Sequence, residues 1–133
     1  MLRPHQLGFG VPHGCEAAAY SAQAYIKDLP ENKALIKLDF KNAFNQVKRD
    51  VVLEAVPTNF PCLLPFVSAG YSTESTLLSG EHEVVSTEGV QQGDPLAPFL
   101  FCMAVKEVTS KLTSELNIWF LDDGTLAGTQ ESL

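Results

Sequence analysis

Two adjacent aspartates, Asp122 and Asp123, stand between two apolar runs in the stretch WFLDDGTLAG. Asp and Gly are turn residues, and Asp-Gly between apolar runs is a strong short-range signal for a β-hairpin. The pair also has a chemical interpretation, because two carboxylates that cannot easily share a site form a ready cage for a divalent cation. The stretch alone leaves both interpretations open.

A third aspartate, Asp39, lies near the end of another apolar run, in KLDFKNAF. Aspartate is depleted in strands, although a strand-end or turn carboxylate would account for Asp39 taken alone. If the two runs are neighbouring strands, Asp39 meets Asp122 and Asp123 at one sheet edge, where the three carboxylates repel one another unless a metal neutralises them. Two Mg²⁺ ions held by aspartates are the usual device for in-line displacement at phosphorus.

The elements that would position these aspartates follow from apolar periodicity and turn residues. The pattern mixes helices with antiparallel strands, so the expected class is α+β, a small antiparallel sheet with helices packed on one face. The expected elements are a loop or irregular strand at 1–12, a helix at 14–28, a strand at 34–40, an amphipathic helix at 45–56, a short helix within 61–71, a hairpin at 75–87, a helix from Asp94 to about Leu116, and a final hairpin of 117–121 and 125–128.

Length and composition fit one globular domain of 133 residues, with 45% hydrophobic and 19% charged residues. Apolar runs are too short to span a bilayer, and the N-terminal stretch lacks a secretory pattern, so an intracellular location, nuclear or cytoplasmic, is expected. The net charge of −7 argues against tight binding of nucleic acid by the isolated chain, because such affinity comes mainly from Lys and Arg against phosphates.

Cysteines and histidines give no metal-binding pattern. Cys15, Cys62 and Cys102 are odd in number and far apart, which argues against a disulfide framework, and there is no Cys-x-x-Cys pair. We expect all three thiols to be reduced and mostly buried as small side chains.

Three motifs, in order along the chain, resemble those of reverse transcriptases. KLDFKNAFNQV resembles the first catalytic motif, EGVQQGDPLAPFLF resembles the second palm motif, and WFLDDG resembles the third, an aromatic residue and any residue followed by two aspartates. The upstream stretch RPHQLGFGVPHGCEAAAYSAQAYI resembles reverse transcriptases of mobile elements without long terminal repeats. The resemblance implies a polymerase palm-like fold, with 1–30 as a remnant of the fingers, 31–133 as the palm, and no thumb.

The resemblance also implies a nucleotidyltransferase site. Asp39, Asp122 and Asp123 match the catalytic metal ligands, with Mg²⁺ as the cofactor and Mn²⁺ as an alternative. The motif matches imply that five further residues contact the incoming nucleotide. Phe40 would offer its backbone near the metal, Ala43 and Phe44 would lie under the sugar, and Gln92 and Gly93 would form a turn that contacts template or nucleotide.

Two residues of the second motif have a simpler explanation. Asp94 followed by Pro95 is a good helix start, with Asp as the capping residue and Pro at the first helical position, so we interpret both as structural.

The family resemblance implies an RNA template, a DNA primer and deoxynucleoside triphosphates as partners, and no membrane. We expect a fragment of a longer polyprotein whose fingers and thumb are missing, and therefore inactivity in isolation. A non-catalytic remnant or recruited interaction domain is the alternative. A nucleotide cyclase with a related core is a third hypothesis, which the second motif disfavours.

Overall fold

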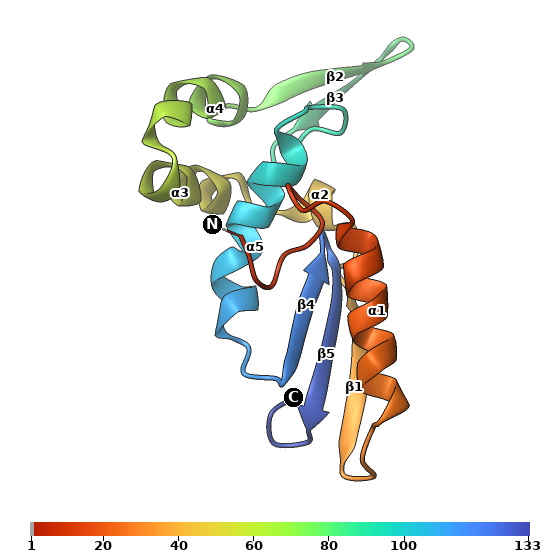
Figure 1. Cartoon of the computed structure of the whole chain (residues 1–133). Helices are drawn as coiled ribbons and strands as arrows, with labels where there is room; N and C mark the ends of the chain where they lie inside the picture. Colours follow the sequence, from red (N-terminus) through yellow and green to blue (C-terminus); the bar gives the residue numbers. More distant parts are fainter. Residues whose placement is uncertain (1) are drawn as a thin grey trace. The chain divides into compact units, whose positions relative to one another are not determined.

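The computed structural model describes residues 2–133, and the chain divides into two compact units (Figure 1). The first unit contains the residues up to Lys41 and those from Val105 onward, while the second contains Asn42–Ala104. The predicted division at residue 30 into fingers remnant and palm stays a prediction.

A three-stranded antiparallel sheet forms the centre of the first unit. Its strands are β1 (Lys33–Asp39), β4 (Leu116–Phe120) and β5 (Asp123–Thr129), in the spatial order β1-β5-β4. The β1–β5 register runs from Lys33 opposite Thr129 to Asp39 opposite Asp123. The β4–β5 hairpin closes through Leu121 and Asp122, so the predicted aspartates do lie at its tip.

β5 lies between the two other strands, and its composition suits that place. Its residues from Gly124 to Gly128 are small or aliphatic and are all buried. Helix α1 (Gly14–Lys27), which Figure 1 draws alongside the sheet, contacts β4. Its alanines lose no side-chain entropy on folding, which favours this helix despite its modest apolar face.

The N-terminal segment runs along the outer edge of β4 and extends the sheet locally. The backbone N–H of Leu7 donates to the carbonyl of Trp119 at 2.7 Å, and the N–H of Trp119 donates to the carbonyl of His5 at 2.8 Å. Gln6 lies between them and forms a parallel bridge with Trp119. The predicted irregular strand is thus a short partner of β4.

The second unit combines helices with a two-stranded hairpin. Its core includes the buried side chains of Val52, Val56, Val67, Leu100 and Phe101. The elements are α2 (Ala43–Gln46), α3 (Arg49–Asn59), the 3₁₀ helix η1 (Pro61–Leu63), α4 (Leu64–Tyr71), β2 (Ser75–Ser79), β3 (His82–Ser86) and the first half of α5 (Ala97–Lys111).

The α+β class is confirmed, as is the order of helices and hairpins along the chain. The long helix ends earlier than predicted, at Lys111 rather than near Leu116. The amide Nδ2 of Asn117 explains the difference, since it donates to the carbonyls of Thr109 at 2.7 Å and Leu112 at 3.1 Å. These bonds satisfy carbonyls at the helix end and let the chain turn into β4.

Two smaller expectations differ from the structure. The amphipathic helix expected at 45–56 is divided into α2 and α3, with Val47 and Lys48 extended between them. Cys102 is buried as expected, but Cys15 and Cys62 are exposed, so the expectation of mostly buried thiols is wrong for these two.

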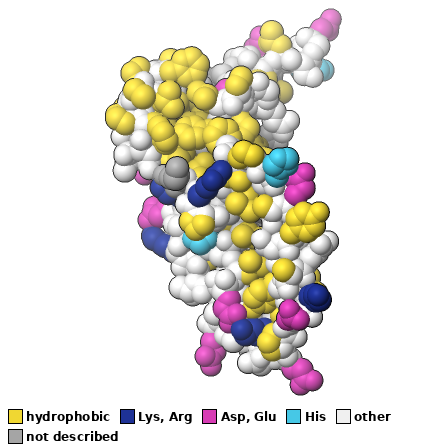
Figure 2. All heavy atoms as spheres, viewed as in Figure 1, with side chains coloured by type: hydrophobic (Ala, Val, Ile, Leu, Met, Phe, Trp, Pro, Cys, Tyr) yellow, Lys and Arg dark blue, Asp and Glu magenta, His cyan; other side chains and the backbone are white. Residues whose placement is uncertain are grey.

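Apolar side chains also reach the surface of the second unit. Figure 2 shows them gathered over α3 and α4, where Val51, Phe60 and Phe66 are exposed. The β2–β3 hairpin adds Leu78, which is 75% exposed.

Candidate active site

The end of the three-stranded sheet brings the predicted catalytic aspartates to one place. Asp39 is the last residue of β1 and lies directly opposite Asp123, the first residue of β5. Asp122 immediately precedes Asp123 and belongs to the two-residue turn. Residues directly opposite in antiparallel strands have Cβ atoms about 5 Å apart. The sheet register therefore brings Asp39 next to the Asp122–Asp123 pair, as the sequence analysis expects for neighbouring strands.

The side chains of these three aspartates lack partners among the described residues. Across the described part of the chain, residues 2–133, none of them takes part in a side-chain hydrogen bond or an ion pair. Asp39 and Asp123 are exposed, and Asp122 is half-buried. Like charges placed directly opposite each other destabilise a sheet, so this arrangement costs folding stability.

The donor set suits a hard divalent cation in kind. Aspartate oxygens are ligands that Mg²⁺ prefers, and two of the three aspartates are opposed on neighbouring strands. However, among residues 2–133 no group of three or more His, Cys, Asp or Glu side chains is arranged to hold a metal ion. Metal binding by Asp39, Asp122 and Asp123 therefore stays a prediction.

Aromatic packing fixes the hairpin beneath the aspartates. Trp119, 2% exposed, lies over Gly124, where an added Cβ would come within 2.6 Å of its ring. The Phe40 ring stacks on the Trp119 ring, with the two ring centroids 5.3 Å apart. The indole Nε1 donates to Asn117 Oδ1 at 2.8 Å. Phe40, predicted as a backbone contact for the metal, thus has a side chain that supports the hairpin.

Asp123 also lines a pocket of about 240 Å³ between α1 and the sheet. Lys37 and Phe120 share this pocket, together with Cys15 and three alanines of α1. The small alanine side chains leave room here next to one of the candidate catalytic acids.

The remaining predicted residues lie in the second unit. Ala43 begins α2 and is buried, and the Phe44 ring stacks on Phe101 with centroids 4.6 Å apart. Gln92 and Gly93 form a turn, as predicted, and Gly93 needs to be glycine because its φ is +91°. The open space beside Gly93 shows that backbone conformation, rather than crowding, requires it.

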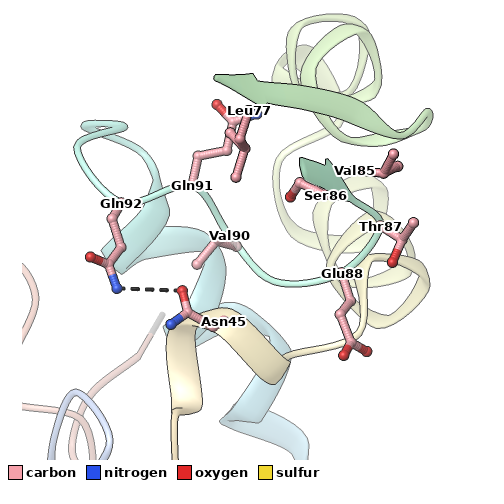
Figure 3. A pocket seen from close by; sticks show the side chains of 9 residues that line it. All are labelled: Asn45, Leu77, Val85, Ser86, Thr87, Glu88, Val90, Gln91 and Gln92. Atoms are coloured by element: carbon pink, nitrogen blue, oxygen red, sulfur yellow. Dashed lines mark hydrogen bonds between the residues drawn. The ribbon is translucent and has the colours of Figure 1, made fainter. Parts of the chain in front are cut away.

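A pocket of about 660 Å³ opens beside this turn (Figure 3). Its lining includes Gln91 and Gln92 from the turn and Leu77 and Val85 from the β2–β3 hairpin. Gln92 Nε2 donates to Asn45 Oδ1 at 3.3 Å, the bond drawn dashed in Figure 3. The lining thus combines amide groups, an apolar wall and the Glu88 carboxylate.

The side chain of Tyr71, which the sequence analysis does not single out, holds this turn. Tyr71 donates a hydrogen bond to Asp94 and accepts one from the Gln91 N–H at 3.3 Å. Burial, followed by the hydrogen bond to Asp94, raises the pKa of Tyr71 to about 12. Asp94 also accepts from the Leu96 N–H at 2.8 Å. Helix α5 begins at Ala97, so the expectation that Asp94 caps this helix with Pro95 at its first position is wrong, although Asp94 does stabilise the turn before the helix.

Arg49 anchors the same region from α3. Its guanidinium, 7% exposed as a residue, donates to the carbonyls of Gly89, Thr73 and Ser86 at 3.0, 3.2 and 3.0 Å. It also lies 5.6 Å from the centre of the Tyr71 ring. Arg49 is the first residue of α3, where a positive charge interacts unfavourably with the helix dipole. This unfavourable position was a signal in the sequence that Arg49 has partners elsewhere.

Comparisons with known proteins agree with these motifs. The family model described as reverse transcriptase (RNA-dependent DNA polymerase) matches residues 1–132. A search of curated proteins gave no match. Within residues 2–133, every helix is too short or too polar to cross a bilayer.

Proposed function

The chain belongs to the reverse transcriptase family, and on this premise we propose that it forms the palm of an RNA-directed DNA polymerase from a mobile element without long terminal repeats. In the proposed reaction, the primer 3′-oxygen forms a bond to the α-phosphorus of a deoxynucleoside triphosphate. The bond between that phosphorus and pyrophosphate breaks, and the hydroxyl proton passes to solvent. The observation that carries this proposal is Asp39 directly opposite Asp123, next to Asp122, with no ion-pair partner among the described residues.

The proposed role of Asp39, Asp122 and Asp123 is to hold Mg²⁺, or alternatively Mn²⁺. A divalent cation bound there supplies positive charge for the attacking and leaving oxygens. The chain contributes a fixed sheet register, which keeps Asp39 opposite Asp123 before any ligand arrives. Such preorganisation is a large part of catalytic stabilisation.

Four residues of the second unit have proposed contacts with the nucleotide. Ala43 and Phe44 would lie under the sugar, and the stacking of Phe44 on Phe101 makes its ring a stiff wall. Such a wall favours deoxynucleotides because a ribonucleotide adds a 2′-OH that needs the same space. Gln92 and Gly93, held in their turn, would contact template or incoming nucleotide, while the Phe40 backbone would lie near the metal.

A non-catalytic interaction domain is the second candidate, and the net charge of −7 favours it. Pairing with template and primer phosphates needs Lys and Arg. For the polymerase proposal, this charge implies that other polypeptide segments, such as the fingers and thumb of a longer polyprotein, supply the basic residues.

Primer extension by the purified chain tests the proposal. The assay uses poly(rA)/oligo(dT), dTTP and either Mg²⁺ or Mn²⁺, with circular dichroism to show that each variant is folded. Asp122→Asn is the test variant and Asp28→Asn, an exposed aspartate after α1, is the matched control. Removing one group that stabilises charge in the transition state typically costs about 10²–10³-fold in rate.

Incorporation that disappears in Asp122→Asn and persists in Asp28→Asn would support the polymerase proposal. Undiminished incorporation by Asp122→Asn would overturn the site assignment. Because the isolated chain is expected to be inactive, a folded wild-type chain that incorporates no nucleotide calls for the same assay in the longer polyprotein. Incorporation there that Asp122→Asn leaves undiminished would favour the non-catalytic candidate.

A further inference from the structure

The tip of the β4–β5 hairpin contains a backbone conformation that its own residue disfavours. Leu121, the first residue of the turn, has a φ of +55°. A side chain at positive φ crowds the backbone, so only Gly, and less often Asn or Asp, adopts this region readily. Some other part of the molecule must therefore stabilise Leu121 in this conformation.

The side chain of Gln6 binds both backbone polar groups of Leu121. Gln6 Oε1 accepts from the Leu121 N–H at 2.8 Å, and Gln6 Nε2 donates to the Leu121 carbonyl at 3.0 Å. The same Oε1 also accepts from the Gly8 N–H at 2.9 Å. Gln6 is only 4% exposed, so water competes little for these bonds.

The N-terminal segment is built to bring this amide close to the turn. Backbone hydrogen bonds of His5 and Leu7 to Trp119 fix it against β4, and Figure 1 draws the segment passing beside that strand. Gly8 allows the approach, because a Cβ there would lie 2.4 Å from the Leu121 nitrogen. A larger residue at position 8 would push the segment away from the turn.

The consequence reaches Asp122 through two peptide planes. The Leu121 N–H belongs to the plane shared with Phe120, and its carbonyl belongs to the plane shared with Asp122. With both planes held, the backbone from which the Asp122 side chain projects has one orientation. A primary amide suits this task because it donates and accepts at the same time.

We propose that Gln6 is a positioning residue that holds Leu121 in its left-handed conformation and thereby orients the Asp122 carboxylate for metal binding. The metal-binding part rests on the proposed function, whereas the hold on Leu121 does not. A merely structural Gln6 would satisfy the turn's polar groups and contribute stability, without any special link to the conformation of Leu121. The two roles differ in what a glycine at position 121 should do.

The experiment compares Gln6→Met, Leu121→Gly and the double variant with wild type and with Gln23→Ala, an exposed glutamine of α1 in the same unit. Methionine keeps the volume of glutamine and removes its hydrogen bonds. The first readout is hydrogen-exchange protection of the Leu121 amide, and the second is Mn²⁺ affinity by electron paramagnetic resonance. Neither readout depends on polymerase activity.

We expect Gln6→Met to lose protection at Leu121 and to weaken Mn²⁺ binding roughly tenfold, the size of effect set by the usual cost of a left-handed non-glycine residue. In the double variant most of the Mn²⁺ affinity should return, because glycine adopts positive φ without help. Gln23→Ala should match wild type in both readouts.

Unchanged Leu121 protection in Gln6→Met would overturn the proposal, and so would an affinity loss that Leu121→Gly fails to rescue. If Gln6→Met does not fold, Gln6→Asn replaces it, since it keeps the amide but is one methylene short, and a partial loss with the same rescue is expected. A wild-type chain that binds no Mn²⁺ would contradict the proposed function, and Leu121 protection would then still decide whether Gln6 holds the turn.

Discussion

Asp94 in the second unit and Asp123 in the first both lie beside turns, in motifs that resemble those of reverse transcriptases. Their carboxylates differ in whether they have hydrogen-bond partners. Asp94 accepts hydrogen bonds from the Tyr71 hydroxyl and from the Leu96 N–H at 2.8 Å. Asp123 has no such partner among the described residues and lies directly opposite Asp39. A carboxylate with partners stabilises the fold, whereas opposed carboxylates without partners weaken it. The partners of a carboxylate therefore separate a structural role from a candidate catalytic one more clearly than its motif does.

The largest loss of stability is expected from replacing Arg49, which holds the region around the Asp94 turn. Arg49→Met should lower the free energy of unfolding by about 3 kcal/mol, because it leaves the carbonyls of Gly89, Thr73 and Ser86 without their buried donor. Urea unfolding measures this change, with Arg3→Met, an exposed arginine, as the control. A loss no larger than that of the control would mean that the second turn does not depend on its side-chain network.

A somewhat smaller loss of stability is expected from a substitution at Gly124, next to the aspartates that lack partners. Gly124→Ala should cost about 2 kcal/mol, because the new methyl group would overlap the buried Trp119 ring, which stacking on Phe40 and a bond to Asn117 hold in place. Gly70→Ala in α4 is the matched control, since nothing lies within 4 Å of its added Cβ and alanine favours a helix. Equal stability for both variants would show that the hairpin tolerates a shifted indole.

The next smaller loss of stability is expected from removing the Tyr71 hydroxyl, which donates to Asp94. Tyr71→Phe should lower the free energy of unfolding by about 1.5 kcal/mol at pH 7, the usual range for a hydrogen bond to a charged group. Burial raises the pKa of Tyr71 from 10.0 to about 12, so the unfolded chain loses this proton at lower pH than the folded chain. The stability that Tyr71 contributes is complete below pH 10 and is lost as the pH rises toward 12.

Unfolding curves measured between pH 8 and pH 12 for wild type and Tyr71→Phe check both the size of the stability loss and its dependence on pH. The difference between the two proteins should shrink across the upper part of this range, while all other titrating groups cancel. A difference that stays constant with pH would contradict the raised pKa.

The smallest expected effect has the opposite sign. Asp123→Asn should raise the free energy of unfolding by about 0.5 kcal/mol at low salt, because it removes a like charge directly opposite Asp39. Added salt should reduce the gain. Urea unfolding of Asp28→Asn provides the control, and a loss of stability in Asp123→Asn alone would show that its carboxylate has a stabilising partner after all.

Sequence reasoning succeeded where local pattern determines structure. The helix at 14–28, the hairpin at 75–87 and the strand ending at Asp39 were all predicted to within a few residues, because periodicity and turn residues act over short distances. The convergence of Asp39 with Asp122 and Asp123 followed from the assumption of neighbouring strands, which the register now supplies.

Sequence reasoning failed where contacts between residues far apart in the chain determine the structure. The expected strands 117–121 and 125–128 leave residues 122–124 for the turn, but the turn is Leu121-Asp122, because Asp123 and Gly124 pair with Phe120 and Trp119. The roles of Gln6 and Arg49 depend on partners 115 and up to 40 residues away, and no local pattern encodes such contacts.

The position of β1 at the outside of its sheet affects how the protein behaves in concentrated solution. In the order β1-β5-β4, one side of the β1 backbone has no strand beside it within that sheet, and Ile36 and Leu38 on it are 39% and 36% exposed. An uncovered strand of this kind can act as a template on which an extended segment of another copy aligns. Lys37, exposed on the same strand, acts as a gatekeeper, because a second copy would have to bring its own lysine near an ammonium group that is already there. Resistance to this kind of association therefore depends on Lys37 as well as on the stability of the folded chain.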